Sequence, residues 1–410
     1  MRLRPALLLA LLTACGPLNP ISTDAGTGGG AGGGAMTGGG GGSTTTGGGV
    51  GGGGATTGGG GGSTTTGGGG GSTTGGGGGT TGGGTGGGGG SSTFSWTRMT
   101  FNPAPGLPSV ARRVVGLGRR GNGETWVALG DGSVWRATAG SEQFSKIPNF
   151  PAPTTTTELI DLSATTDEVL IIRGQTILSC AGTCADFSDF VGVKTITFGE
   201  DPIALCTRGA RALFTTQQGT TTLLYEAQRS GNALTGFTAV SQSLGIDGGE
   251  RCTIAENGDV WIPGSNGVAV LRAAGGVGNE AIDLMGQPGA RWTAVAMAGA
   301  TGLAVGGGSG YRFAQRVGTT WNSLAPNTAG PLMNTVLALS STEFFAGGET
   351  NGGSSTLPAF FRWNGAGFVP LSGVPAGVDA HRGLVVSANE VYFGGAERDG
   401  SAYVVLHGVR

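Results

Sequence analysis

Residues 93–410 are predicted to form an all-β fold built from repeated sheets, and three observations support this. Short apolar runs alternate with Gly, Asn and Asp turns, without helix-period patterns. An apolar strand recurs every 41 to 47 residues. An aromatic marker follows it in most repeats, and one displaced copy stands before the first repeat. Four strands in a repeat of this length are typical of a β-propeller, so we expect seven four-stranded blades, with an N-terminal strand completing the last blade.

The recurring apolar strand is the second strand of each predicted blade. Many Asn-Gly and Asp-Gly pairs lie between the apolar runs, and such pairs suit the positive φ angles of two-residue hairpin turns. The repeats are therefore expected to be antiparallel. The strand's first apolar positions are Trp126, Val169, Leu213, Val260, Leu303, Phe344 and Val391.

The aromatic marker is expected in the outermost strand of each blade. It is an aromatic residue followed three positions later by an apolar one. The seventh repeat lacks it, whereas the orphan copy Trp96-Thr97-Arg98-Met99 precedes the first repeat. Pairing strands from both termini in one blade would close the ring. The other copies begin at Phe144, Phe187, Phe237, Ile282 (a weaker copy), Trp321 and Phe368.

The N-terminus carries a short targeting pattern. Two arginines precede an apolar run too short to span a bilayer, and Leu12-Thr13-Ala14-Cys15 follows. This order resembles the lipobox of bacterial lipoproteins. The resemblance implies a signal peptide at residues 1–14, a lipid on Cys15 that anchors the chain to a membrane, and a lipidated N-terminus at residues 15–24. Gly16, in place of the aspartate that resembles an inner-membrane retention signal, favours the outer membrane, on its periplasmic face or at the cell surface.

Residues 25–92 are almost entirely Gly, Thr and Ser. Glycine loses much backbone entropy on ordering, and no apolar surface is present to offset that loss. We therefore expect a disordered tether with a root-mean-square span of roughly 45 Å. Without its signal the chain has 25 acidic residues and all but two of its 23 basic ones. This near-neutral balance argues against a nucleic-acid partner.

Four cysteines remain once Cys15 is assigned to lipid, and an exported protein favours their pairing. Three pairings are open. Cys180 and Cys184 bracket a short hairpin, which leaves Cys206 and Cys252 for the inner strands of adjacent blades. A metal site is the alternative, disfavoured because the two histidines are remote in sequence and no Cys-x-x-Cys pair occurs.

No motif assigns a catalytic, cofactor-binding or metal-binding residue. Gly116–Gly121 matches a dinucleotide fingerprint by letter, but Asn122-Gly123 turns the chain into a strand where that fingerprint requires a helix. Scattered carboxylates could still meet at the channel mouth, or be solvated loop residues. The candidate acids are Asp161, Glu200, Glu250 and Asp379. Four arginines that flank the first inner strand are anion-binding candidates or a solubilising rim: Arg112, Arg113, Arg119 and Arg120.

Two partial resemblances concern the type of repeat. The double glycines Gly306-Gly307, Gly347-Gly348 and Gly394-Gly395 resemble kelch repeats in three of the seven units. The segments Gly123–Trp126 and Gly318–Trp321 resemble the tail of an Asp-box.

The predicted function is a monomeric binding or scaffold lipoprotein of the cell envelope, with a protein or glycan ligand on the propeller. One alternative is a polysaccharide hydrolase or lyase with a propeller active site. Another is an envelope assembly factor, since the architecture resembles the propeller lipoprotein of the outer-membrane insertion machinery.

Overall fold

The computed structural model describes residues 93–105, 113–152, 158–241, 244–248, 251–265, 267–283, 291–308, 310–324, 331–350 and 357–410. Cys15, the predicted tether, Arg112 and Glu250 lie outside these ranges. Within them, no helix is long and apolar enough to cross a membrane.

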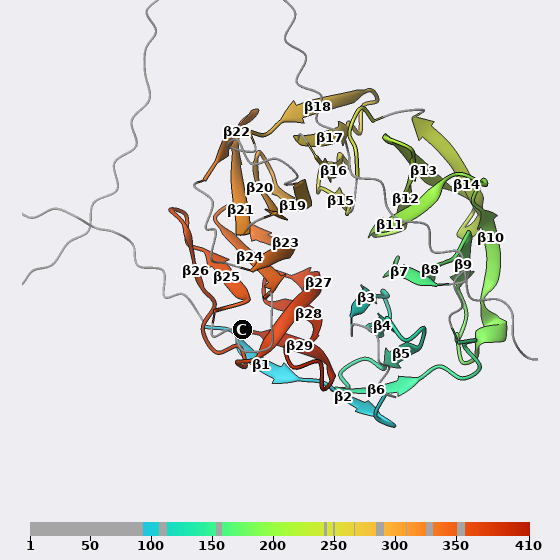
Figure 1. Ribbon diagram of the computed structural model, residues 1–410. Coiled ribbons are helices and arrows are strands. Elements are labelled where there is room, and N and C mark those ends of the chain that lie inside the picture. Colours follow the sequence, from blue (N-terminus) through green and yellow to red (C-terminus); the bar gives the residue numbers. More distant parts are fainter. Residues whose placement is uncertain are drawn as a thin grey trace, which may run out of the picture. The chain divides into compact units, whose positions relative to one another are not determined.

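Seven sheets are arranged in a ring around a central axis (Figure 1). Each blade is antiparallel from its inner to its outer strand, as its turn-separated apolar runs predict. All seven marker positions fall in the second strand of a blade, which confirms the repeat. From the axis outward, blades 1 to 3 contain β3 (Val114–Arg119), β4 (Thr125–Leu129), β5 (Val134–Ala137) and β6 (Gln143–Lys146); β7 (Leu159–Ala164), β8 (Val169–Arg173), β9 (Thr176–Cys180) and β10 (Val191–Thr195); and β11 (Asp201–Arg208), β12 (Arg211–Gln218), β13 (Thr221–Ser230) and β14 (Ala233–Ser241).

The remaining four blades follow the same order. They contain β15 (Thr253–Ile254), β16 (Val260–Gly264), β17 (Gly267–Leu271) and β18 (Val277–Ala281); β19 (Arg291–Ala298), β20 (Thr301–Gly308), β21 (Gly310–Val317) and β22 (Thr320–Ser323); β23 (Leu332–Ser340), β24 (Glu343–Glu349), β25 (Phe360–Trp363) and β26 (Phe368–Pro370); and β27 (Val378–Ser387), β28 (Glu390–Glu397), β29 (Tyr403–Val409) and β1 (Ser95–Arg98).

The N-terminal segment closes the ring and does more than the sequence predicted. β1 pairs antiparallel with β29 and completes blade 7, with Trp96 opposite Gly408. β2 (Thr100–Asn102) then pairs parallel with β6, so blade 1 has five strands and not the four expected. The same short segment therefore joins the last blade to the first (Figure 1).

The second aromatic marker is placed differently from the prediction. Phe187–Asp189 forms the 3-10 helix η1, and the outer strand β10 begins only at Val191. The carboxylate of Asp186 caps this turn by accepting from the amide of Ser188. A capped turn competes locally with strand formation, which the aromatic spacing alone did not reveal.

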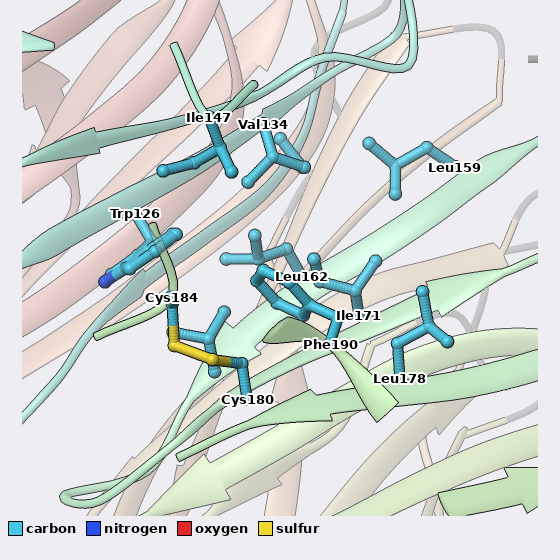
Figure 2. Close-up of a cluster of buried hydrophobic side chains, with 12 residues drawn as sticks. Trp126, Val134, Ile147, Leu159, Leu162, Ile171, Leu178, Cys180, Cys184 and Phe190 are labelled. Carbon is cyan, nitrogen blue, oxygen red and sulfur yellow. A yellow bond between two sulfur atoms is a disulfide. The ribbon is translucent and has the colours of Figure 1, made fainter. Parts of the chain in front are cut away.

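The core is divided among the blade interfaces. In the described residues, each pair of adjacent blades shares one cluster of buried apolar side chains. Between blades 1 and 2, Trp126 and Ile147 meet Leu162, Ile171 and Phe190 (Figure 2). Face packing between sheets thus supplies the apolar burial that stabilises the ring.

Gly116 and Gly118, which belong to the fingerprint-like segment, lie in β3. A Cβ on Gly116 would stand 2.2 Å from the amide nitrogen of Leu162, and a Cβ on Gly118 would stand 2.6 Å from that of Ala164. These glycines therefore let the inner strands of blades 1 and 2 approach closely. β3 continues into a hairpin with β4, as expected from Asn122-Gly123.

Candidate functional site

The axis of the propeller holds a cavity of about 940 Å³ lined by the inner strands of all seven blades. We call the end where the inner strands begin the bulge end, and the end where they turn into the second strands the turn end. Polar atoms form the larger part of its accessible wall, because apolar residues of the inner strands such as Leu205, Val295 and Val336 are buried between the blades. Hydroxyl side chains, including Ser163, Thr207 and Ser340, line it toward the turn end. Six charged residues also line it, and its volume is within the range of ligand-binding pockets.

A β-bulge marks the bulge end in six of the inner strands. One residue is left unpaired at the same point of the repeat, and bulges of this kind redirect side chains. The unpaired residues are Val115, Ile160, Ile203, Thr293, Asn334 and His381.

Three of these bulge residues are polar, and each forms a hydrogen bond with the next blade. The hydroxyl of Thr293 donates to the carbonyl of Met333 at 2.5 Å. The amide group of Asn334 donates to the carbonyl of Ala380 at 3.2 Å. Nδ1 of His381 accepts from the amide of Val114 at 3.3 Å. The partner groups belong to Met333, Ala380 and Val114, each of which directly precedes the bulge of its own strand. The same contact therefore repeats from blade 5 to blade 6, from blade 6 to blade 7 and from blade 7 to blade 1.

The residues that follow the bulges form a second ring, which we call the post-bulge ring. In blade 4 the position is found by alignment with blade 1. Thr253 pairs with Trp261 as Gly118 pairs with Trp126, so Arg251, two residues before Thr253, corresponds to Gly116. Six of its seven members line the cavity, and Gly116 is the exception. The members are Gly116, Asp161, Ala204, Arg251, Ala294, Thr335 and Arg382.

Asp161 and Arg382 meet across blade 1. Nε of Arg382 donates to the carbonyl of Val115 at 2.6 Å and lies 3.7 Å from Oδ1 of Asp161. The Asp161 carboxylate also accepts from the amides of Leu162 and Leu205 at 2.9 and 2.8 Å. Burial raises the pKa of Asp161 to about 6, although Arg382 and the two amides oppose this shift.

Arg251 extends from blade 4 to blade 7. Its guanidinium donates to the carbonyl of His381, and NH1 of Arg382 donates to the same oxygen at 3.3 Å. Two cations therefore meet at one carbonyl at the edge of the cavity. The His381 ring is buried beside them, and its burial together with the charge of Arg113 lowers its pKa to about 4. At neutral pH this imidazole is uncharged, as its role as acceptor requires.

The structure does not bring the candidate acids together. Asp161 is in the post-bulge ring. Glu200 accepts from Thr216 and from the phenol of Tyr225, at 3.0 and 2.8 Å, inside blade 3. Asp379 accepts from Thr350 and forms an ion pair with Arg398 at 3.1 Å. Each of these three carboxylates is buried and bonded within the fold, contrary to the expectation of solvated loop residues; Glu250 is outside the described residues.

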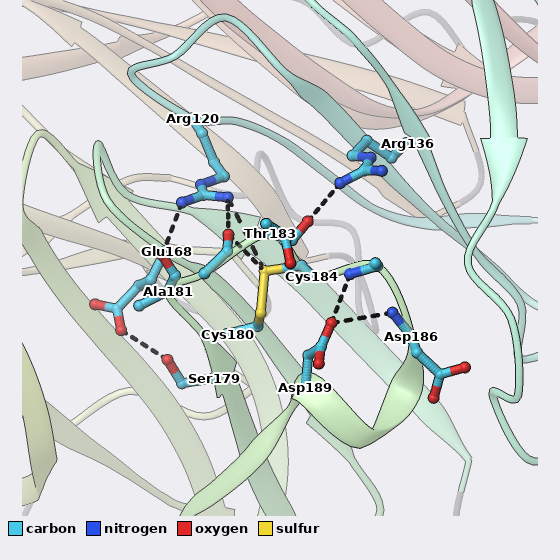
Figure 3. Close-up of a disulfide and its surroundings, with 12 residues drawn as sticks. Arg120, Arg136, Glu168, Ser179, Cys180, Ala181, Thr183, Cys184, Asp186 and Asp189 are labelled. Atoms are coloured by element: carbon cyan, nitrogen blue, oxygen red, sulfur yellow. Dashed lines mark hydrogen bonds between the residues drawn. A yellow bond between two sulfur atoms is a disulfide. The ribbon is translucent and has the colours of Figure 1, made fainter.

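The described arginines of the first inner strand are not one cluster. Arg113 lies at the bulge end, where it is more than half exposed and stands 3.5 Å from Glu349. Arg119 lies at the turn end in an ion pair with Glu390. Arg120 donates to the carbonyls of Asp167, Ala181 and Gly182 beside a disulfide (Figure 3). The strand places its arginines at opposite ends, so anion binding by the whole set stays a prediction.

Both expected disulfides are present. Cys180 and Cys184 are joined with their Cα atoms 5.9 Å apart, and Arg136 donates to the carbonyl of Thr183 within the loop that they close (Figure 3). Cys206 and Cys252 are joined with Cα atoms 5.5 Å apart. The second bond links β11 to the segment before β15, and both cysteines line the cavity.

The sequence reasoning missed Arg251, His381 and Arg382. No local motif marks them, but a signal existed in the repeat itself. The members of the post-bulge ring recur with nearly the same spacing as the apolar strands. An alignment of the seven repeats therefore shows charged residues at this position in three blades, where the other four have Gly, Ala or Thr.

No family model and no curated protein matches this chain. Several solved structures are similar in fold. A YCF48 protein bound to a D1 peptide has a TM-score of 0.53 at 11% identity, over 77% of this chain and 97% of that one. A streptogramin B lyase has a TM-score of 0.54 at 12% identity, over 77% and 98%. The WD40 repeats of RRP9 have a TM-score of 0.55 at 11% identity, over 77% and 98%. At such identities these likenesses show the β-propeller fold and nothing finer.

Proposed function

We propose that this protein is a binding or scaffold propeller held at the bacterial cell envelope by a lipid on Cys15. The glycine-rich segment 25–92 is the tether that gives the propeller its reach. The observation that carries the proposal is the axial cavity, to which all seven inner strands contribute. A site fixed by a closed ring is preorganised for a ligand, which reduces the entropy lost on binding.

The state of the candidate acids favours binding over hydrolysis. A catalytic pair of carboxylates must flank one substrate bond. Asp161, Glu200 and Asp379 instead lie in different blades, and each is bonded to backbone amides, hydroxyls or an arginine of the fold. These contacts explain the three buried carboxylates without a reaction.

A protein or glycan ligand fits the proposal. One structural neighbour is described as bound to a peptide, which supports a peptide as one class of partner for a ring of this kind. The pairing of β1 with β29 closes the ring within one chain, so no second chain is needed to complete a blade, which supports the proposal of a monomer.

Retention and turnover test the ligand side of the proposal. The purified protein is passed over glycan and peptide arrays, and the retained compounds are then incubated with it and analysed for products. Retention with no product is the expected result. Release of shortened glycan would instead establish the hydrolase or lyase alternative.

Fractionation tests the anchor. Wild-type protein is expected in the outer-membrane fraction, and Cys15→Ser is expected to leave the membrane while keeping the circular dichroism spectrum of a folded β protein. A Cys15→Ser variant that stays in the membrane would refute the lipid anchor.

A further inference from the structure

The Arg251 side chain crosses the bulge end of the axial cavity from one side of the ring to the other. Its guanidinium donates to the carbonyl of His381, so it joins blade 4 to blade 7. These blades are as far apart as a ring of seven allows, with blades 5 and 6 between them on one side and blades 1 to 3 on the other (Figure 1). We call the Arg251 side chain in this position the crossbar. It obstructs the bulge end of the cavity that it lines.

The backbone that carries the crossbar is held only weakly by its own blade. The inner strand of blade 4, β15, has two residues, whereas the other six inner strands have six to ten. The described register between β15 and β16 begins at Thr253, so Arg251 lies before the paired residues. A segment with few backbone hydrogen bonds opens locally at low cost. The crossbar therefore depends on contacts outside its own sheet.

Two contacts with the neighbouring blades restrain this segment. Cys252, which directly follows Arg251, is bonded to Cys206 in β11 of blade 3. On the other side, the hydroxyl of Thr253 donates to the carbonyl of Val295 in β19 at 2.8 Å. A single neutral hydrogen bond is a weak restraint beside a covalent bond. The disulfide is therefore the main restraint on the backbone next to the crossbar.

The two disulfides of the protein differ in their access to small molecules. Cys252 is only partly buried, and it lines the cavity together with Cys206. Cys180 and Cys184 are 2% and 0% exposed, and neither lines the cavity. Thiol–disulfide exchange requires that a thiolate reach one of the two sulfur atoms. A small dithiol in the cavity can therefore reach Cys252, whereas the other disulfide is covered.

We propose that the Cys206–Cys252 disulfide is a redox latch that keeps the crossbar in place, and that a dithiol opens the bulge end of the cavity by reducing it. A thiolate of the dithiol attacks Sγ of Cys252, the bond to Cys206 breaks, and the Cys206 thiolate takes up a proton. The second thiol of the reagent then closes the reagent's own disulfide and releases Cys252 as a thiol, so two electrons pass to the protein. Arg251 can then exchange the His381 carbonyl for water.

Differential alkylation tests the latch. The purified full-length protein is treated for a short fixed time with dithiothreitol over a range of concentrations, alkylated with iodoacetamide and analysed by peptide mass spectrometry. Cys206 and Cys252 are expected to be labelled at a dithiothreitol concentration at least roughly tenfold lower than Cys180 and Cys184, because only the first pair is reached without unfolding. Equal labelling of the two pairs, or earlier labelling of Cys180 and Cys184, would overturn the proposal.

Arginine labelling with phenylglyoxal tests the crossbar. Arg119 is the control, since it also lines the cavity but lies at the turn end in an ion pair with Glu390. After selective reduction, labelling of Arg251 is expected to rise at least roughly fivefold and that of Arg119 to stay unchanged, because only the segment of Arg251 is released. Unchanged labelling of Arg251 in the reduced protein would refute the link between the disulfide and the crossbar.

Paired cysteine variants repeat this test without a reductant. Cys206→Ala with Cys252→Ala is expected to show the higher labelling of Arg251, and the matched control Cys180→Ala with Cys184→Ala is expected to keep the wild-type level. Near-ultraviolet circular dichroism of the reduced wild type accompanies the labelling. Loss of its spectrum would mean that the disulfide holds the whole ring, which would refute a local latch.

The inference rests on the proposed binding function, because it concerns access to the cavity assigned to the ligand. Its test nevertheless uses no ligand. If the labelling experiments fail and the arrays still retain a glycan or peptide, the latch is wrong and the binding function stands. If the labelling experiments succeed and the arrays retain nothing, the latch stands and the binding function fails.

Discussion

His381 is a buried histidine whose contacts require the neutral form. Its Nδ1 accepts from Val114 at the junction of blades 7 and 1, and burial beside Arg113 lowers its pKa to about 4. The unfolded chain has the ordinary histidine pKa near 6.5, so it takes up a proton in a range where the folded protein does not. The stabilising contribution of His381 is therefore complete above pH 6.5 and is lost as the pH falls toward 4.

Replacing His381 with asparagine should remove this pH dependence, because the amide oxygen can accept from Val114 but does not titrate. Relative to His381→Asn, wild type should lose about 2 kcal/mol of unfolding free energy between pH 7.5 and pH 5. The measurement is urea unfolding of both proteins at the two pH values.

The comparison between the two proteins is needed because Asp161 acts in the opposite direction. Its pKa is raised to about 6, so its contribution to stability increases as the pH falls through 6. Both proteins contain Asp161, and its effect cancels in their difference. Parallel pH profiles for the two proteins would contradict the assignment for His381.

Gly116 is a residue whose missing side chain matters. A Cβ there would overlap the backbone of Leu162 in the next blade, at 2.2 Å from the amide nitrogen. Gly116→Ala should therefore lower the unfolding free energy by at least about 2 kcal/mol, because neither backbone can yield without shifting a blade. Gly278→Ala is the control, since a Cβ at this strand residue meets nothing within 4 Å. Thermal melting that ranks the two alanine variants as equal would disprove the close contact.

At the level of elements, the sequence predicted what local patterns determine. Turn pairs such as Asn122-Gly123 and the apolar runs between them located the second strand of every blade, because hairpins form from residues close in the chain. The predicted closing strand was also correct, since Trp96 and its neighbours repeat the pattern of an outer strand. β2 was not predicted, because it pairs with β6 across some forty residues and its sequence has no repeat partner.

The candidate site was predicted less well, for a related reason. The bulges depend on how each inner strand meets its neighbour. Nothing in the sequence around Arg251 indicates that the Arg251 side chain will reach blade 7. Only the ring places residues of blades 4 and 7 at one carbonyl. The disulfide between Cys206 and Cys252 could be predicted, because an even number of cysteines and the blade repeat together limit the pairings.

In the molecule as a whole, the ring depends on a short N-terminal segment. Neighbouring blades share apolar clusters, but among the described residues blade 7 alone is a sheet that combines strands from both ends of the chain, with β1 beside β29. Trp96 packs over Gly408 with its ring against Phe345 and Phe393, and Arg98 forms an ion pair with Glu397. The segment therefore fills the outer face of blade 7 before it crosses to blade 1.

A chain that begins at residue 93 should melt like the full-length protein, whereas one that begins at residue 104 should lose at least about 3 kcal/mol of unfolding free energy. The shorter chain lacks the partly buried Trp96 and the buried Met99, and it lacks the strand pairing of β1 and β2. Together these losses account for a change of this size. Hydrogen exchange should locate the change, with protection lost in β29 and β6, the strands left without partners, and retained in blades 3 to 5. If β29 and β6 were protected equally in both chains, face packing between the blades would be sufficient to close the ring and the prediction would be wrong.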